Sequence, residues 1–117
     1  MIELPHHPVT PEELARVDKL QKQMFERHRK VPEEGATITF RDHKYFVLPG
    51  VFWPHVDESG IGSCTPILDH YQINEGENVL DVGTGTGVIA RDAAGKADRV
   101  YVTALDINLQ ACKSAYR

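Results

Sequence analysis

A short glycine-rich segment is the part of this sequence best suited to chemistry. Gly83, Gly85 and Gly87 alternate with Thr84 and Thr86 directly after a run of apolar residues. Glycines let the backbone turn sharply and let a ligand approach the main chain closely, and a following helix presents unpaired N–H groups. The segment therefore predicts a binding loop. Its threonines are interpreted as loop residues that hydrogen-bond the backbone or a cofactor, because no general base lies beside them in sequence.

An acidic residue lies at the end of the next apolar segment. Asp106 follows residues 99–105, whose composition predicts a strand. A carboxylate at the tip of such a strand accepts two hydrogen bonds from ribose hydroxyls, which a neutral side chain does less well. The position and charge of Asp106 therefore indicate a ribose-bearing ligand.

The elements that must position these residues form a βαβ unit. Residues 78–82 predict a short apolar strand, buried on both faces of a parallel sheet. Residues 88–94 continue as a helix that ends near Gly95, and residues 99–105 form the second strand. A right-handed crossover leaves the C-terminal ends of both strands at one edge, where ligands of such sheets bind.

The spacing of the glycines separates two classes of cofactor. Dinucleotide binders carry GxGxxG, in which the third glycine lets the helix pack on the strand. Here the pattern is GxGxG, and Val88 stands where the last glycine of a dinucleotide site is expected. Asp81, two residues before the first glycine, is not generally required by dinucleotide binders. Half of an NAD-dependent dehydrogenase is therefore the disfavoured alternative.

The same residues carry a family resemblance. Residues 79–90, VLDVGTGTGVIA, resemble motif I of the class I S-adenosylmethionine (SAM) methyltransferases, and ALDIN at 104–108 resembles the acidic motif that follows it. The resemblance is specific from about residue 78 to residue 108. It implies SAM as the cofactor and an α/β, partial Rossmann-like class I methyltransferase fold, with parallel strands and flanking helices.

The resemblance assigns a role to each residue of the motif. The loop glycines would pack on the methionine part of SAM, Asp106 would bind the ribose and Ile107 would lie against the adenine. Asp81 would support the loop and reach the cofactor's amino group directly or through water. The cofactor-binding residues expected from this motif are Asp81, Gly83, Thr84, Gly85, Gly87, Asp106 and Ile107.

A second resemblance lies upstream of the glycine loop. Residues 49–63, PGVFWPHVDESGIGS, are similar to a segment of the release-factor glutamine and RNA adenine methyltransferase group that folds over the SAM pocket. It implies that Phe52, Pro54, Asp57 and Ser59 belong to a lid, with Asp57 and Ser59 added to the cofactor-binding set. A surface loop with an apolar plug is the alternative. Trp53 and His55 depart from that group's pattern, so the substrate class stays open.

The N-terminal part predicts a helix and a short β-hairpin. Thr10, Pro11 and Glu13 are typical of a helix start, and the helix is expected to run to about His28. Its apolar stripe, interpreted as a docking face, comprises Leu14, Val17, Leu20, Met24 and Phe25. Residues 37–40 and 45–48 predict the hairpin around an RDHK turn, and a second helix is expected from Thr65, as its cap, to Tyr71.

This reading divides the chain in two. Residues 1–50 hold the N-terminal helix and hairpin, as a substrate or lid extension, and residues 51–117 form a truncated SAM-binding domain. A class I methyltransferase usually has seven strands, and this part predicts two. We therefore expect the remainder of the same fold, or a second chain, to complete the sheet. No motif that holds or deprotonates the methyl acceptor is present, so no catalytic residue is assigned.

Composition narrows the class of protein. The chain has 117 residues, enough for one domain, with a net charge of -4, which argues against strong sequence-independent binding of nucleic acid. Its six histidines lack ligand spacing and its two cysteines lack CxxC spacing, so no metal site or disulfide is predicted. No apolar run approaches the roughly 20 residues of a membrane span, and no signal pattern begins the chain, so a cytoplasmic location is expected.

Two functions follow from the sequence. The first is the cofactor-binding part of a SAM-dependent methyltransferase that acts on a protein, RNA or small-molecule acceptor. The second is a non-catalytic interaction module, or a pseudo-methyltransferase subunit completed by a partner chain, which docks through the apolar stripe of the first helix.

Overall fold

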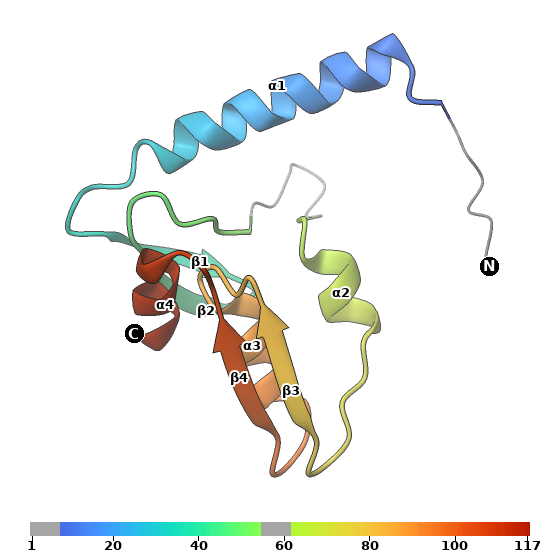
Figure 1. The fold of residues 1–117 in the computed structure, drawn as a ribbon, viewed down its shortest axis with the longest axis vertical. Coiled ribbons are helices and arrows are strands. Elements are labelled where there is room, and N and C mark those ends of the chain that lie inside the picture. The colour runs from blue at the N-terminus through green and yellow to red at the C-terminus, as the bar shows by residue number, and fades with distance from the viewer. Residues whose placement is uncertain (1–7, 55–61) are drawn as a thin grey trace.

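The computed structural model describes residues 8–54 and 62–117. It is an α/β structure in which a long helix and a hairpin precede a βαβ unit (Figure 1). The elements in chain order are α1 (Pro11–His28), β1 (Ala36–Phe40), β2 (His43–Val47), α2 (Thr65–His70), β3 (Asn78–Val82), α3 (Val88–Ala94), β4 (Tyr101–Leu105) and α4 (Leu109–Tyr116). The partial Rossmann-like fold class predicted from the sequence is confirmed.

The βαβ unit places the glycine loop beside the end of β4. Strands β3 and β4 pair in parallel, with Val82 opposite Leu105, and α3 lies behind both strands (Figure 1). The backbone N–H groups of Gly83 and Thr84 donate to the carbonyl oxygen of Leu105, at 2.7 Å and 3.0 Å. The loop therefore begins directly against the residue that precedes Asp106.

The prediction that the strand at residues 78–82 is buried on both faces is wrong. Leu80 and Val82 are 61% and 70% exposed, and Leu105 on the same face is 53% exposed. Because α3 packs against the opposite face, Asp81 is buried there. Within residues 8–54 and 62–117, no element covers the face that carries Leu80. The apolar composition of β3 is that of a strand with a layer on each side, and only one layer is present here.

The hairpin has a tighter turn than the sequence predicted. Arg41 and Asp42 form a two-residue turn with positive φ angles of 47° and 63°, the geometry of a type I′ turn. His43 and Lys44, expected in the turn, instead pair with Phe40 and Thr39. A type I′ turn matches the twist of the flanking strands, and Asp42 tolerates the left-handed region better than most residues.

The hairpin shares its core with the helices that follow. One cluster joins Phe40 and Tyr45 of the hairpin to Leu68 of α2 and Val88 of α3. A second cluster joins Val47, Val51 and Ala111 of α4. The hydroxyl of Ser114 in α4 accepts a hydrogen bond from the backbone N–H of Leu48 at 3.1 Å. The hairpin is therefore held to α2, α3 and α4 by burial, and the residue after β2 is held to α4 by a hydrogen bond.

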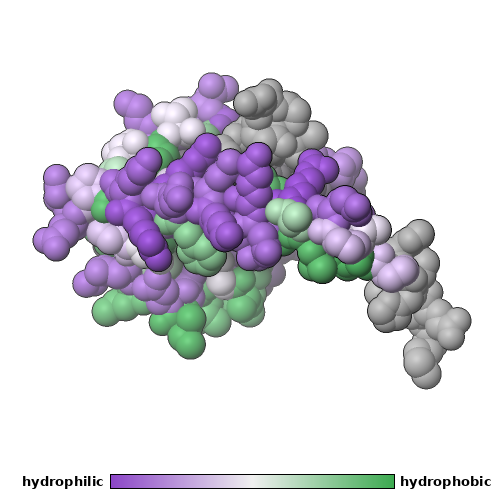
Figure 2. Space-filling view, turned by 90° about the horizontal axis from the view of Figure 1, so that it is seen from above, coloured by the Kyte–Doolittle hydropathy of each residue, from purple (hydrophilic) through white to green (hydrophobic). Residues whose placement is uncertain are grey.

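Helix α1 begins with the capping box that the sequence predicted. The N–H of Glu13 donates to the Thr10 hydroxyl at 3.2 Å, and the N–H of Thr10 donates to the Glu13 carboxylate at 2.8 Å. None of its residues is buried, and Leu14, Leu20 and Phe25 are each more than half exposed. Seen from above, hydrophilic side chains dominate this side of the molecule and apolar ones gather along one edge (Figure 2).

Helix α2 begins at Thr65, the residue that was expected to be its cap. Cys64 occupies the N-cap, and the Thr65 hydroxyl instead accepts from the N–H of Gly62 at 2.9 Å. At the other end, the Tyr71 hydroxyl donates to Asp92 of α3 at 2.5 Å. Burial, followed by this hydrogen bond, raises the pKa of Tyr71 above its usual value. The neutral phenol therefore ties α2 to α3.

The close packing of α4 on the loop gives a first prediction. A Cβ at Gly87 would lie 3.0 Å from the Cβ of Ala115, whereas a Cβ at Gly76 would meet nothing within 4 Å, although their φ angles are 80° and 78°. Gly76→Ala should lower the free energy of unfolding by about 1–2 kcal/mol, the cost of left-handed backbone. Gly87→Ala should cost about 1 kcal/mol more, from overpacking. Urea unfolding measures both, and equal losses would contradict the packing argument.

Candidate functional site

The glycine loop connects β3 to α3 and turns through the left-handed region. The φ angles of Gly83, Gly85 and Gly87 are 77°, 55° and 80°, which L side chains rarely adopt. A Cβ at Gly85 would lie 3.1 Å from the carbonyl oxygen of Phe52. The loop therefore needs glycine both for its backbone conformation and for the close approach of the upstream segment.

Asp81 holds the glycine loop and the start of α3 through two hydrogen bonds. Its buried carboxylate accepts a hydrogen bond from the Thr84 hydroxyl at 2.7 Å and another from the N–H of Ala90 at 3.1 Å. The second bond satisfies one of the free N–H groups in the first turn of α3. Asp81 thus joins the end of β3, the loop and the start of α3. Its contact with a cofactor stays a prediction.

Asp106 joins the loop to the end of β4. One carboxylate oxygen accepts from the N–H of Gly85 at 2.9 Å, and the other accepts from the N–H of Asn108 at 2.8 Å. The bond from Asn108 contributes most, followed by the bond from Gly85, and both lower the pKa of Asp106. The group is therefore ionised at neutral pH. Each oxygen keeps a further lone pair for a ligand.

A cavity of about 280 Å³ lies over the loop. Gly83, Gly85 and Asp106 line it from the sheet edge, and Phe52 and Pro54 line it from the upstream segment. The structure thus brings Gly83, Thr84, Gly85 and Asp106 together with two of the four predicted lid residues, whereas Gly87 lines a different cavity. The other two, Asp57 and Ser59, lie outside the described residues.

Ile107 is placed differently from the other predicted residues. It is fully exposed and does not line the cavity over the loop. With Val82 and Leu105 it borders a second hollow that shares Gly83 and Asp106 with the first. Ile107 therefore lies on the side of Asp106 that faces the uncovered surface of the sheet.

Several further lining residues were not singled out in the sequence, among them Gly50, Cys64 and Asn108. Gly50 and Cys64 line the cavity from segments far from the motif, and Asn108 lines it from the cap of α4. The side chain of Asn108 donates to the carbonyl oxygen of Gly50 at 3.2 Å. Asn108 was visible as the last residue of ALDIN, whereas only the fold reveals Gly50 and Cys64 as neighbours of the loop.

His28 connects the end of α1 to the segment over the cavity. Its ring lies 5.4 Å from the Phe52 ring in an edge-on arrangement and 4.5 Å from the Trp53 ring. Burial lowers the pKa of His28 because it disfavours the charged imidazolium. Phe52 therefore lies between the loop and α1, with a neutral imidazole behind it.

The described part of the chain shows neither a metal site nor a membrane-spanning helix. No group of three or more His, Cys, Asp or Glu side chains there is arranged to hold a metal ion. No helix there is long and apolar enough to cross a membrane.

The chain is similar to known methyltransferases. The family model described as methyltransferase small domain matches residues 43–117, which include the loop and Asp106. The ribosomal protein L11 methyltransferase of Exiguobacterium sp. strain AT1b is 32% identical over 92 residues, which are 79% of this chain and 26% of the relative. The chain thus spans about a quarter of the length of this curated relative. No solved structure matches it.

The buried carboxylate of Asp81 gives a prediction about the loop. Asp81→Asn replaces a charged acceptor of two hydrogen bonds by a neutral amide. We expect the free energy of unfolding to fall by about 1–3 kcal/mol, the range for hydrogen bonds to a charged group. Asp98→Asn, which changes an exposed acid before β4, should stay within about 0.5 kcal/mol. Equal denaturation midpoints for the two variants would contradict the role of Asp81.

The lowered pKa of His28 gives a prediction about pH. Neutral His28 stabilises the contact above its ordinary pKa of 6.5, and this stabilisation is lost as the pH falls through the lower pKa of the folded state. The fluorescence of Trp53, the only tryptophan, should change with a midpoint below 6.5. His28→Gln should abolish the change, and His43→Gln, an exposed control, should keep it. Persistence of the transition in His28→Gln would disprove the assignment.

Proposed function

The chain belongs to the family of methyltransferase small domains, and on that premise we propose that the cavity over the glycine loop binds SAM. The family uses SAM as methyl donor. The observation that carries the proposal is the ionised Asp106, which lines one cavity with the glycine loop and has lone pairs left for ribose hydroxyls.

The residues of the cavity fit SAM in chemistry. The volume of about 280 Å³ lies just below the usual range for small-molecule sites, about 300–1,000 Å³. Gly85 brings backbone close to Phe52, so a side chain there would obstruct the cavity. Phe52 and Pro54 supply apolar surface opposite the polar loop. Asp106 supplies the negative charge and Gly83 the close approach of main chain.

The chain's part in the reaction is to hold and orient the methyl donor. SAM supplies a methyl group on a sulfonium sulfur, and transfer to a nucleophile is an in-line displacement that depends on close alignment. Asp106 and the loop would hold the ribose and the methionine part, while Phe52 and Pro54 would exclude water from one side. We assign no residue of this chain to the acceptor's deprotonation.

We further propose that more protein covers the exposed face of the sheet. Leu80, Val82 and Leu105 form an apolar surface there, next to the hollow bordered by Ile107. The relative is about three times as long as this chain, and the match covers 26% of it. The remainder of the methyltransferase fold, or a second chain, would cover this surface and bring the acceptor to the donor.

For the acceptor we propose a protein. This follows from the similarity to the ribosomal protein L11 methyltransferase, whose name states a protein acceptor. Methylation of a ribosomal protein would take place in the cytoplasm, the location expected from the sequence. RNA and small-molecule acceptors are the alternatives, and methylation assays with radiolabelled SAM on purified ribosomal proteins and on RNA distinguish them.

Titration calorimetry with SAM tests the donor site. Asp106→Ala removes a charged hydrogen-bond acceptor, so we expect affinity to fall about 10- to 100-fold. Asp98→Ala, at the opposite end of β4, is the matched control and should bind SAM as the unaltered chain does. Absence of SAM binding by the unaltered chain, or equal affinities of the two variants, would refute the proposed site.

A further inference from the structure

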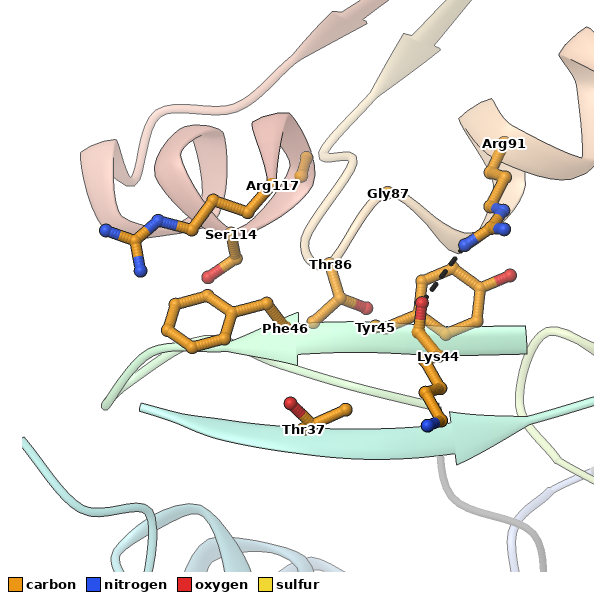
Figure 3. Close-up of a pocket in the computed structure, with 10 residues that line it drawn as sticks. Thr37, Lys44, Tyr45, Phe46, Thr86, Gly87, Arg91, Ser114 and Arg117 are labelled. Atoms are coloured by element: carbon orange, nitrogen blue, oxygen red, sulfur yellow. Dashed lines mark hydrogen bonds between the residues drawn. The ribbon is translucent and has the colours of Figure 1, made fainter. Parts of the chain in front are cut away.

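A different cavity lies between the hairpin and the two C-terminal helices. Its volume is about 320 Å³, and β1 and β2 form one wall while α3 and α4 lie opposite (Figure 3). Thr86 of the glycine loop lines both this cavity and the one over the loop. The two cavities are therefore neighbours, and the proposed methyl-donor site does not account for this one.

The lining of this cavity is basic. Lys44 of β2, Arg91 of α3 and Arg117 after α4 all line it, and no Asp or Glu does. Within the described part of the chain, none of these three forms an ion pair with a carboxylate, whereas Arg41, Lys96 and Arg99 do. Lys44 faces Arg91 with its carbonyl oxygen, and its side chain extends toward β1 (Figure 3). In a chain with a net charge of -4, two arginines and a lysine without a carboxylate partner at one cavity indicate an anionic ligand.

The guanidinium groups are held in place without using up their donors. Arg91 donates to the carbonyl oxygen of Lys44 at 3.0 Å, and its Cζ lies 5.4 Å from the centroid of the Tyr45 ring. Arg117 lies over the Phe46 ring with its Cζ 4.7 Å from the centroid. Figure 3 shows the two arginines at opposite ends of the cavity. Most of their N–H groups remain available to an anion.

Hydroxyl groups complete the lining. Thr37 of β1 and Thr86 both line the cavity, and neither hydroxyl forms a hydrogen bond within the described part of the chain. Burial raises the pKa of Tyr45, so its phenol stays a donor. A phosphate has several oxygens and more than one negative charge. Arginine and hydroxyl donors around an open cavity therefore suit a phosphate ligand better than a carboxylate ligand.

We propose that this cavity binds a phosphate group of a ligand, separately from the methyl-donor site. The phosphate could belong to a free phosphorylated molecule or to a nucleic-acid backbone, and both sources offer the same chemistry to Arg91, Lys44 and Arg117. The proposed phosphate site does not require SAM, because Lys44, Arg91 and Arg117 do not line the cavity over the loop.

Titration calorimetry of the full chain at constant ionic strength, without SAM, tests the proposal. The probes are pyrophosphate and a single-stranded RNA hexamer, with a hexaglutamate peptide as a carboxylate probe. Lys44→Gln and Arg91→Gln should each weaken phosphate binding about tenfold or more. Lys113→Gln, an exposed residue of α4 outside the cavity, makes the same change in charge and should leave binding unaltered.

Each result of these titrations either supports or overturns the proposed phosphate site. Binding of pyrophosphate that both cavity variants weaken supports a free phosphate ligand, and binding of the RNA alone with the same dependence supports a backbone. Arg91→Gln also removes a bond to the hairpin, so Lys44→Gln serves as the variant that keeps that bond. No binding of either probe, equal loss in Lys113→Gln, or equal binding of hexaglutamate would overturn the proposal.

Discussion

The attachment of the glycine loop to the end of β4 is the constraint on which the rest of the structure depends. Gly83 and Thr84 donate to Leu105, and Gly85 donates to Asp106, so three successive N–H groups are held by the neighbouring strand. Asp81 holds the same loop to α3. A loop so rich in glycine loses much conformational entropy when it is ordered, and these bonds offset that cost. These hydrogen bonds therefore fix the backbone of the glycine loop.

The hairpin positions the segment that lines the cavity opposite the glycine loop. Val47 and Val51 pack with Ala111, which fixes the chain between β2 and the cavity, and Asn108 holds Gly50 by a hydrogen bond. As a result Phe52 approaches Gly85 although 33 positions separate them in sequence. The same packing encloses the basic cavity behind Thr86. One body of contacts between hairpin and helices therefore forms both cavities.

In the described part of the chain, residues 8–54 and 62–117, two apolar surfaces are exposed. The stripe on α1 and the face of β3 and β4 that carries Leu80 both expose large apolar side chains. They differ in position, since the sheet face adjoins Asp106 while α1 approaches the site at His28. Exposed apolar area next to a binding site is typical of a surface that other protein covers. This agrees with a chain that matches a quarter of its relative.

Local sequence determined those features that short-range rules govern. The capping box at Thr10, the βαβ order, the loop glycines and the position of Asp106 at a strand end all follow from spacing within a few residues. Three other features do not follow from local spacing: the tight turn at Arg41, the first residue of α2 and the exposure of Leu80. Turn register and burial depend on partners elsewhere in the chain. Only the tertiary structure decided that Phe52, Cys64 and Asn108 share a cavity with the loop, and that Lys44, Arg91 and Arg117 surround another. Contacts between segments far apart in sequence are set by the packing of the hairpin on α3 and α4, which no local pattern encodes.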